Sequence, residues 1–208
     1  MPAVATQRVP HGFGAVARAN SYFPIVISSY AVLYSIWWPF AWGLPGGIAF
    51  GAVVLLAVFF VARGIVQVRH AMSFPNDDTE ENARIGKQMG ILNSVTHPIW
   101  MIGTIVLLIL GQGRWVLPLM IFVIGAHFLP MAHILNRKID YLLGPIAMAS
   151  ATWAGVLAFN DQASWLVVFS VAGIGGTLST LGYALYMSKA YQRLCHDAGV
   201  PFPTRNVT

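Results

Sequence analysis

Six apolar segments, each about twenty residues long, constrain this chain more than any other feature. A helix needs roughly 20 mainly apolar residues to cross the hydrocarbon core of a membrane. The chain of 208 residues is 57% hydrophobic and only 9% charged, whereas soluble domains contain about 25% charged residues. It therefore has too few charged side chains to cover a water-facing surface. We predict an all-α bundle of six transmembrane helices, at about 22–42, 45–66, 88–110, 115–135, 140–159 and 164–187.

The segments between the predicted helices have the composition of turns and tails. Short stretches rich in Gly, Pro or polar residues follow the first, third and fifth helices, at 42–47, 111–114 and 160–164. The N-terminal segment contains no apolar core of signal-peptide length, so we expect an uncleaved tail with an interfacial piece around 13–17. One membrane domain (22–187) is thus predicted between an N-terminal tail (1–21) and a C-terminal tail (188–208).

Lys and Arg are distributed unequally between the two sides of this predicted bundle. Eleven of the twelve lie in the two tails, in or beside the connection 67–87, and in the turn 136–140, which all fall on one side. Arg114 alone falls on the other side. Cytoplasmic loops carry the excess of Lys and Arg in membrane proteins, so we predict that both termini are cytoplasmic. The net charge of +5 therefore indicates orientation, and no nucleic-acid partner is expected.

Four acidic residues, Asp77, Asp78, Glu80 and Glu81, cluster in the connection between the second and third helices. A cation site or a docking patch is one interpretation, but the spacing of a calcium-binding loop is absent. Carboxylates also stabilise the first turn of a helix, and Asp78 or Thr79 is a suitable N-cap. We therefore expect the third helix to begin here, outside the membrane.

Small residues recur at four-residue spacing in several predicted helices, and such spacing lets transmembrane helices approach closely. The sixth helix has the longest series, Ala172, Gly176, Thr180 and Ala184. Shorter series occur in the fifth helix (Ala147, Ala151, Gly155), the third (Gly86, Gly90, Ser94) and the second (Gly47, Gly51). We expect them to pack helices within one chain, with a homodimer or a larger membrane complex as the alternative use.

The centres of the predicted helices contain no Asp, Glu, Lys or Arg, although ion-coupled transport usually relies on an intramembrane carboxylate. Thr96 and His133 are further polar residues of the third and fourth helices. The predicted polar site itself consists of two histidines and their neighbours: Asn93, Ser94, His97, Pro98, His127 and Pro130. Both histidines lie ten residues from a basic residue at the cytoplasmic boundary, and hence about 15 Å deep. The two prolines free the carbonyl groups of Ser94 and Ala126. A polar pocket near the midplane is therefore predicted.

Three interpretations of these histidines remain open. The rings could hydrogen-bond across the helix pair as polar packing, or line a small polar cavity or conduction path in which histidine titrates. Alternatively, His97 and His127 could bind a metal or serve as axial ligands of a haem. A zinc site needs three or four close ligands, and His133 lies too near the headgroups to join them. His127 and His133 also lie about 120° apart around their helix.

The single cysteine, Cys195, excludes an intramolecular disulfide and a cysteine-ligated cluster. It is followed by His196 and Asp197, but adjacent residues of a helix point in different directions. We therefore expect this triplet to be part of the cytoplasmic tail.

The region from "RIGKQMG" (84–90) to "IDYLLGPIAM" (139–148) resembles a family of small bacterial membrane proteins that is known only as a domain of unknown function. Its characteristic "GxHFxPxA" stretch is matched by Gly125, His127, Phe128, Pro130 and Ala132. Tyr141 and Gly144 match the segment that follows the basic turn. The resemblance covers about a third of the chain. It implies a location in the bacterial cytoplasmic membrane and draws attention to His127.

Taken together, these features predict a multi-pass membrane protein embedded in the lipid bilayer, without a catalytic motif. We expect a non-enzymatic protein with a small polar site or pathway between the third and fourth helices, for transport, permeation or sensing of an unidentified solute. Two alternatives remain: a haem- or quinone-associated redox subunit that uses His97 and His127, and an accessory subunit of a larger membrane complex.

Overall fold

The computed structural model describes residues 9–159 and 163–202, and their regular structure is entirely helical. The elements are α1 (Phe13–Ser21), α2 (Phe23–Ser35), α3 (Trp38–Met72), α4 (Glu80–Ile109), the 3-10 helix η1 (Gly113–Trp115), α5 (Val116–Ile134), α6 (Asp140–Phe159) and α7 (Trp165–Asp197). Five helices are long and apolar enough to cross a membrane: α3, α4, α5 together with η1, α6 and α7. The predicted all-α membrane architecture is thus confirmed.

The first predicted helix, 22–42, starts as predicted but ends earlier than predicted. α1 and α2 are separated at Tyr22, and α2 ends at Ser35. Pro24 and Pro39 lie in the first turns of α2 and α3. A proline lacks the backbone N–H and its ring clashes with the carbonyl four residues earlier, so each proline ends the preceding helix. α2 alone has 13 residues and is therefore about 20 Å long.

The turn predicted at 42–47 occurs at Gly43, within the residues assigned to α3. Gly43 has φ 58° and ψ −134°, a backbone conformation that is accessible mainly to glycine. The chain returns so closely that a Cβ atom added at Gly46 would lie 2.0 Å from the carbonyl oxygen of Trp38. Glycines at both positions therefore allow the chain to reverse.

The third predicted helix begins outside its apolar segment, as the acidic cluster indicates. Thr79 is the N-cap of α4, and its hydroxyl accepts a hydrogen bond from the backbone N–H of Asn82 at 3.2 Å. Glu80 and Glu81 occupy the first turn, where the positive end of the helix dipole favours carboxylates. This helix start is confirmed.

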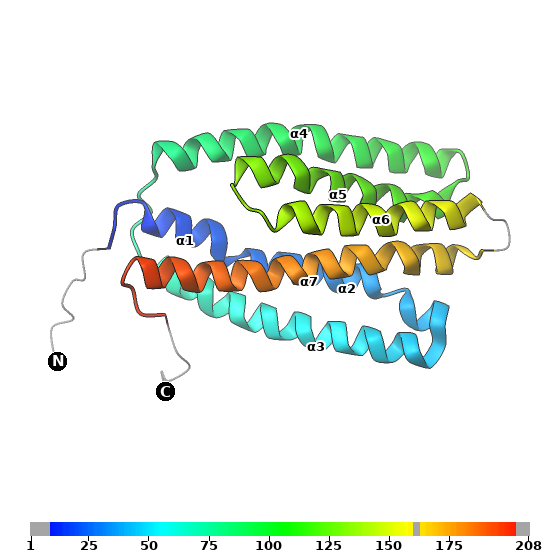
Figure 1. The fold of residues 1–208 in the computed structure, drawn as a ribbon, viewed down its shortest axis with the longest axis horizontal. Helices are drawn as coiled ribbons and strands as arrows, with labels where there is room; N and C mark the ends of the chain where they lie inside the picture. Colours follow the sequence, from blue (N-terminus) through cyan, green and yellow to red (C-terminus); the bar gives the residue numbers. More distant parts are fainter. Residues whose placement is uncertain (1–8, 160–162, 203–208) are drawn as a thin grey trace.

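The helices are arranged around α7, which packs against α1, α2, α3, α5 and α6 (Figure 1). α5 and α6 pack on one side of α7, and α2 and α3 on the other. α3 and α4 therefore form the two outer edges of the bundle. Both ends of the described chain lie at one end of the bundle, here called the terminal end; the turn at 110–113, the end of α6 and the start of α7 mark the far end (Figure 1).

Small residues account for the close packing of α7. The predicted series Ala172, Gly176, Thr180 and Ala184 is buried. A Cβ atom added at Gly173 would lie 2.2 Å from the carbonyl oxygen of Tyr34 on α2. One added at Gly176 would lie 2.6 Å from Ile121 on α5. The α7 backbone therefore touches two neighbouring helices where a larger residue would hold them apart.

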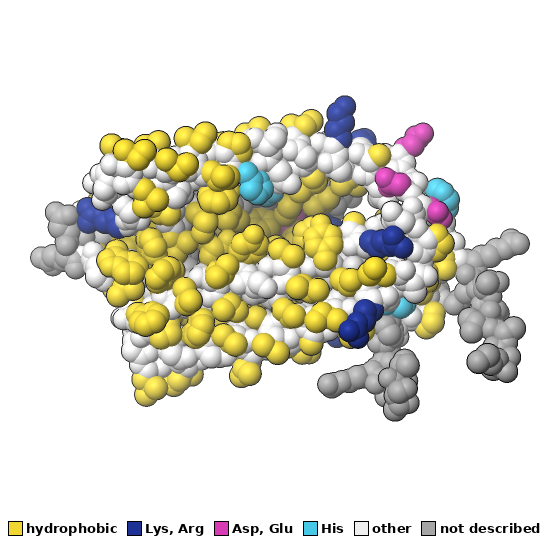
Figure 2. All heavy atoms as spheres, turned by 180° about the vertical axis from the view of Figure 1, so that it is seen from behind, with side chains coloured by type: hydrophobic (Ala, Val, Ile, Leu, Met, Phe, Trp, Pro, Cys, Tyr) yellow, Lys and Arg dark blue, Asp and Glu magenta, His cyan; other side chains and the backbone are white. Residues whose placement is uncertain are grey.

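The surface of the bundle matches a protein surrounded by lipid. Hydrophobic side chains cover the long face shown in Figure 2, whereas charged side chains gather mainly at one end of it. Exposed apolar residues occur along both edge helices, including Leu55 (73%) on α3 and Ile109 (79%) on α4. Contact of these apolar side chains with lipid chains is favourable, whereas their exposure to water costs free energy.

Candidate functional site

The candidate site lies between α4, α5 and α6, and its geometry begins with the edge position of α4. No residue of α4 is buried, although the helix has 30 residues. Within the described chain it packs chiefly against α5 and the adjoining η1. The predicted pairing of the third and fourth spans is therefore present, but it forms the margin of the bundle instead of its centre.

His127 is joined to α4 by a hydrogen bond that determines its tautomer. Its Nδ1 atom lies 3.0 Å from the Oγ1 atom of Thr96. Both contacts are hydrogen bonds at the same time only if the Thr96 hydroxyl donates its single proton to the carbonyl of Leu92, at 2.9 Å, and accepts from Nδ1. Neutral His127 therefore carries its proton on Nδ1, and Nε2 is a hydrogen-bond acceptor. The described residues provide no partner for Nε2.

The other predicted polar residues on α4 lie away from this hydrogen bond. His97 is exposed, and its Nδ1–H donates to the backbone carbonyl of Asn93 at 3.0 Å. Ser94 is also exposed and bonds to the carbonyl of Ile91. Because consecutive helical residues are rotated by about 100°, His97 lies on a different flank of α4 from Thr96. The two histidines therefore sit on neighbouring helices without a hydrogen bond between them in the described residues.

The two predicted prolines are both exposed on their helices. Pro98 leaves the carbonyl of Ser94 without its helical donor, and Pro130 does the same for Ala126. Only Pro130 and Ala126 contribute to a cavity that also contains His127. The freed carbonyl on α5 is thus part of the candidate site, whereas the one on α4 lies beside exposed His97.

A small cavity of about 220 Å³ surrounds the His127 ring. It is lined by Leu92, Thr96 and Ile99 from α4 and by Phe122, Val123, Ala126, His127 and Pro130 from α5. The Thr96 hydroxyl is already used by Leu92 and His127. Two acceptors therefore remain among the lining residues: the Nε2 atom of His127, and the carbonyl of Ala126, which Pro130 leaves without a helical donor.

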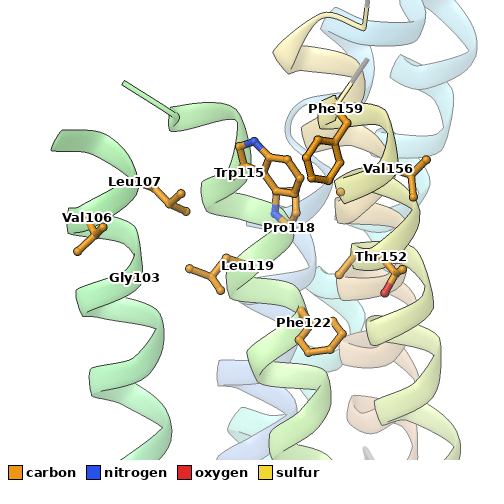
Figure 3. A pocket seen from close by; sticks show the side chains of 12 residues that line it. Gly103, Val106, Leu107, Trp115, Pro118, Leu119, Phe122, Thr152, Val156 and Phe159 are labelled. Carbon is orange, nitrogen blue, oxygen red and sulfur yellow. The ribbon is translucent and has the colours of Figure 1, made fainter. Parts of the chain in front are cut away.

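A larger cavity of about 640 Å³ lies toward the far end of the bundle (Figure 3). α5 forms its floor, while α4 and α6 form its walls, and its lining is almost entirely apolar. Trp115 and Phe159 close its far end, with ring centroids 4.6 Å apart. Val156 is 66% exposed, so the cavity opens sideways between helices instead of through the end of the bundle.

The two cavities adjoin at Phe122, which lines both. On η1 and α5 their lining extends from Trp115 to Pro130, and on α4 from Leu107 to Leu92. At 1.5 Å per residue, this groove is about 22 Å long. We refer to it as the α5 groove: it has a long apolar part and a small end lined by two hydrogen-bond acceptors.

Thr96 was noted as a polar residue of the third helix but was not included in the predicted site, and Phe122 was not predicted at all. Thr96 precedes His97 by one position, and hydropathy does not indicate how far α4 is rotated about its axis. Phe122 is one of many aromatic residues in an apolar helix. The signal for Thr96 was its hydroxyl group within an otherwise apolar segment, but the sequence did not indicate that it faces His127.

Other polar groups lie outside the groove. His133 is exposed near the terminal end. Cys195 is buried, 4.0 Å from Nδ1 of His70, whereas His196 and Asp197 are exposed and contact each other, so the three do not form one site. No cluster of three or more His, Cys, Asp or Glu residues suited to a metal ion occurs in the described part of the chain.

No protein-family model, curated protein or solved structure matches the chain. The candidate site therefore rests on its own geometry.

Proposed function

We propose that this integral membrane protein binds an amphiphilic molecule that it takes up sideways from the bilayer into the α5 groove, with His127 as the polar anchor. The observation that carries the proposal is the junction of an apolar cavity of about 640 Å³ with a smaller one containing His127. This volume falls within the roughly 300–1,000 Å³ of small-molecule sites. In this proposal, the polar site expected between the third and fourth spans consists of residues of α5 together with Thr96 of α4.

Support for an amphiphile comes from the direction in which the groove opens. Val106, Val156 and Phe159 line it and are 46%, 66% and 80% exposed, so the route into it passes through the apolar surroundings of the bundle. A strongly hydrated solute would lose its water on this route at a large cost in free energy. A molecule dissolved in the membrane enters without that cost.

The test compares the chain with a variant whose groove is filled. Gly155 faces the groove, and a Cβ atom there would lie 3.4 Å from the Trp115 ring, so Gly155→Leu would occupy the space without striking backbone. We expect solvent extraction and mass spectrometry to find a lipid-soluble compound that co-purifies with the wild-type protein and is depleted in Gly155→Leu. Gly47→Leu is the control, since a Cβ atom at Gly47 meets no atom within 4 Å. Identical extracts from all three proteins would refute the proposal.

A second function, as a subunit of a larger membrane complex or a homodimer, is favoured by the outer flank of α4. His97 and Ser94 are exposed there, although polar residues within membrane helices usually face protein. Added Cβ atoms at Gly86 and Gly90 would meet nothing within 4 Å. We expect crosslinking in native membranes to give a specific product that Gly90→Leu abolishes; a product unchanged by Gly90→Leu would exclude this surface.

We further propose that the chain resides in a bacterial cytoplasmic membrane with both termini in the cytoplasm, and that it belongs to the family with the "GxHFxPxA" stretch. The location is supported by the excess of Lys and Arg. The family is supported by two motif glycines that pack together: a Cβ atom added at Gly125 would lie 2.9 Å from the carbonyl oxygen of Gly144. A reporter enzyme active only in the periplasm should be inactive when fused after Thr208, and activity there would reverse the orientation.

A further inference from the structure

We infer that the ligand of the α5 groove is a quinol: a single aromatic ring with hydroxyl groups, attached to an apolar chain. This inference rests on the proposed function and specifies the chemistry of its ligand. It follows from three properties of the groove: which hydrogen-bonding groups it offers, how large its polar end is, and what the rest of its length can contain.

The polar end offers acceptors and no donor to a ligand. The Thr96 hydroxyl proton is used by the carbonyl of Leu92, so Nδ1 of His127 donates to Thr96 and Nε2 accepts. The second free group is the carbonyl of Ala126, because Pro130 has no N–H to offer it. A ligand head must therefore donate. A hydroxyl group can donate, whereas the carbonyl oxygens of a quinone would face two acceptors.

The polar end has room for one ring. Its volume is about 220 Å³, and a cavity of roughly 150 Å³ in another protein holds benzene. The additional space accommodates ring substituents. Phe122 lines this end and provides an aromatic surface, against which a second ring packs favourably. A phosphate-bearing headgroup would instead bring a charge to a place where no Lys or Arg lines the cavity.

The remainder of the groove suits an apolar chain attached to that ring. The cavity of about 640 Å³ begins at Phe122 and extends to Trp115 and Phe159. The groove is about 22 Å long, and Val156 at its side is exposed, so a chain longer than the groove would continue between helices into the bilayer. Ring, hydroxyl and chain thus each match a separate part of the groove.

The test is calorimetric titration of the full-length protein in detergent, under anaerobic conditions, with decylhydroquinone, decylbenzoquinone and 1-decanol. We expect decylhydroquinone to bind about tenfold more tightly than decylbenzoquinone. The hydroquinone donates a hydrogen bond to the acceptors of the groove, whereas a quinone carbonyl is itself an acceptor and leaves them unsatisfied. We also expect decylhydroquinone to bind more tightly than 1-decanol, which lacks the ring. Equal affinity for all three would overturn the quinol assignment.

Two variants examine the cause of the preference. Thr96→Val removes the acceptor for Nδ1, so His127 can carry its proton on Nε2 and donate to a carbonyl. We expect the preference for the hydroquinone to fall to about threefold or less, with binding of the quinone improved. His97→Leu is the control on the other flank of α4, and it should leave the preference unchanged. An undiminished preference in Thr96→Val would contradict the tautomer argument and with it the quinol assignment.

Gly155→Leu separates the two proposals. If Gly155→Leu lowers the affinity for all three probes but the wild-type protein binds quinol and quinone equally, the groove binds amphiphiles and the quinol assignment is wrong. If it weakens none of the three, the α5 groove is not their binding site, and the proposed function is wrong as well. Circular dichroism of each variant establishes that the helices are intact.

Discussion

At the scale of single residues, the glycines of this chain differ in what surrounds them. A Cβ atom added at Gly125 would lie 2.8 Å from Met148 and 2.9 Å from the backbone carbonyl of Gly144. Because backbone cannot yield as a side chain does, we expect Gly125→Ala to separate α5 from α6 and to lower the free energy of unfolding by about 1–3 kcal/mol. Thermal unfolding in detergent, followed by circular dichroism, measures the change.

The matched residue-scale control is Gly90→Ala on α4. No atom lies within 4 Å of a Cβ atom at Gly90, and alanine favours helix over glycine by up to about 1 kcal/mol. The variant should therefore match or exceed the wild-type melting temperature. If both variants melted at the same temperature, the α5–α6 contact at Gly125 would not have the proposed importance.

At the scale of one element, α4 depends on its own hydrogen bonds more than on packing, because none of its residues is buried. The Thr79 hydroxyl caps its first turn, and removal of an N-cap costs about 1 kcal/mol. We therefore predict that Thr79→Ala accelerates amide hydrogen exchange in residues 80–87 about fivefold, as measured by mass spectrometry. Ser164→Ala, which removes the cap of α7, should leave exchange in 80–87 unchanged. Equal effects of both variants there would indicate global destabilisation instead of fraying of α4.

At the scale of the whole molecule, Arg137 connects separate parts of the terminal end. It donates hydrogen bonds to Tyr183 on α7 and to Asn20 on α1, and it interacts electrostatically with Asp140. Asp140 is fully buried, and its carboxylate oxygens have no hydrogen-bond partner in the described residues. Arg137→Gln would leave this charge uncompensated, so we expect it to lower the free energy of unfolding by about 3 kcal/mol.

A double-mutant cycle shows whether the charge of Asp140 is the cause. Asp140→Asn combined with Arg137→Gln should recover at least half of the lost stability, because the buried charge is then absent. Lys138→Gln, at the exposed neighbouring position, should have little effect. Additive losses in the double variant would show that Arg137 acts through Tyr183 and Asn20 alone.

The helices of this bundle were largely predictable because their signals are local. The predicted spans 115–135 and 140–159 agree closely with α5 and α6, since about twenty consecutive apolar residues suffice to identify a spanning helix. Thr79 was predictable as a cap from its own chemistry and that of the acidic residues beside it. The error at 22–42 arose from Pro39, whose local effect on helices outweighs hydropathy.

The candidate site was only half predictable for a different reason. Depth along a helix follows from residue number, so His97 and His127 were correctly assigned to the third and fourth helices. Which side chains meet depends on how far each helix is rotated about its axis. A rotation of 100° brings the next residue in the chain to the position that faces the neighbouring helix. The close contacts of Gly125, Gly173 and Gly176 with neighbouring helices restrict that rotation for α5 and α7, and they join residues far apart in the chain.

The sequence by itself therefore determined that this is a helical membrane protein, where its long apolar helices lie along the chain, and which side carries the positive charge, because these properties depend on short stretches of chain. Only the tertiary structure decided that α4 lies at the edge, that Thr96 rather than His97 bonds to His127, and that α4, α5 and α6 enclose a groove. Those features depend on the relative rotation and spacing of helices, which are set by packing between distant segments.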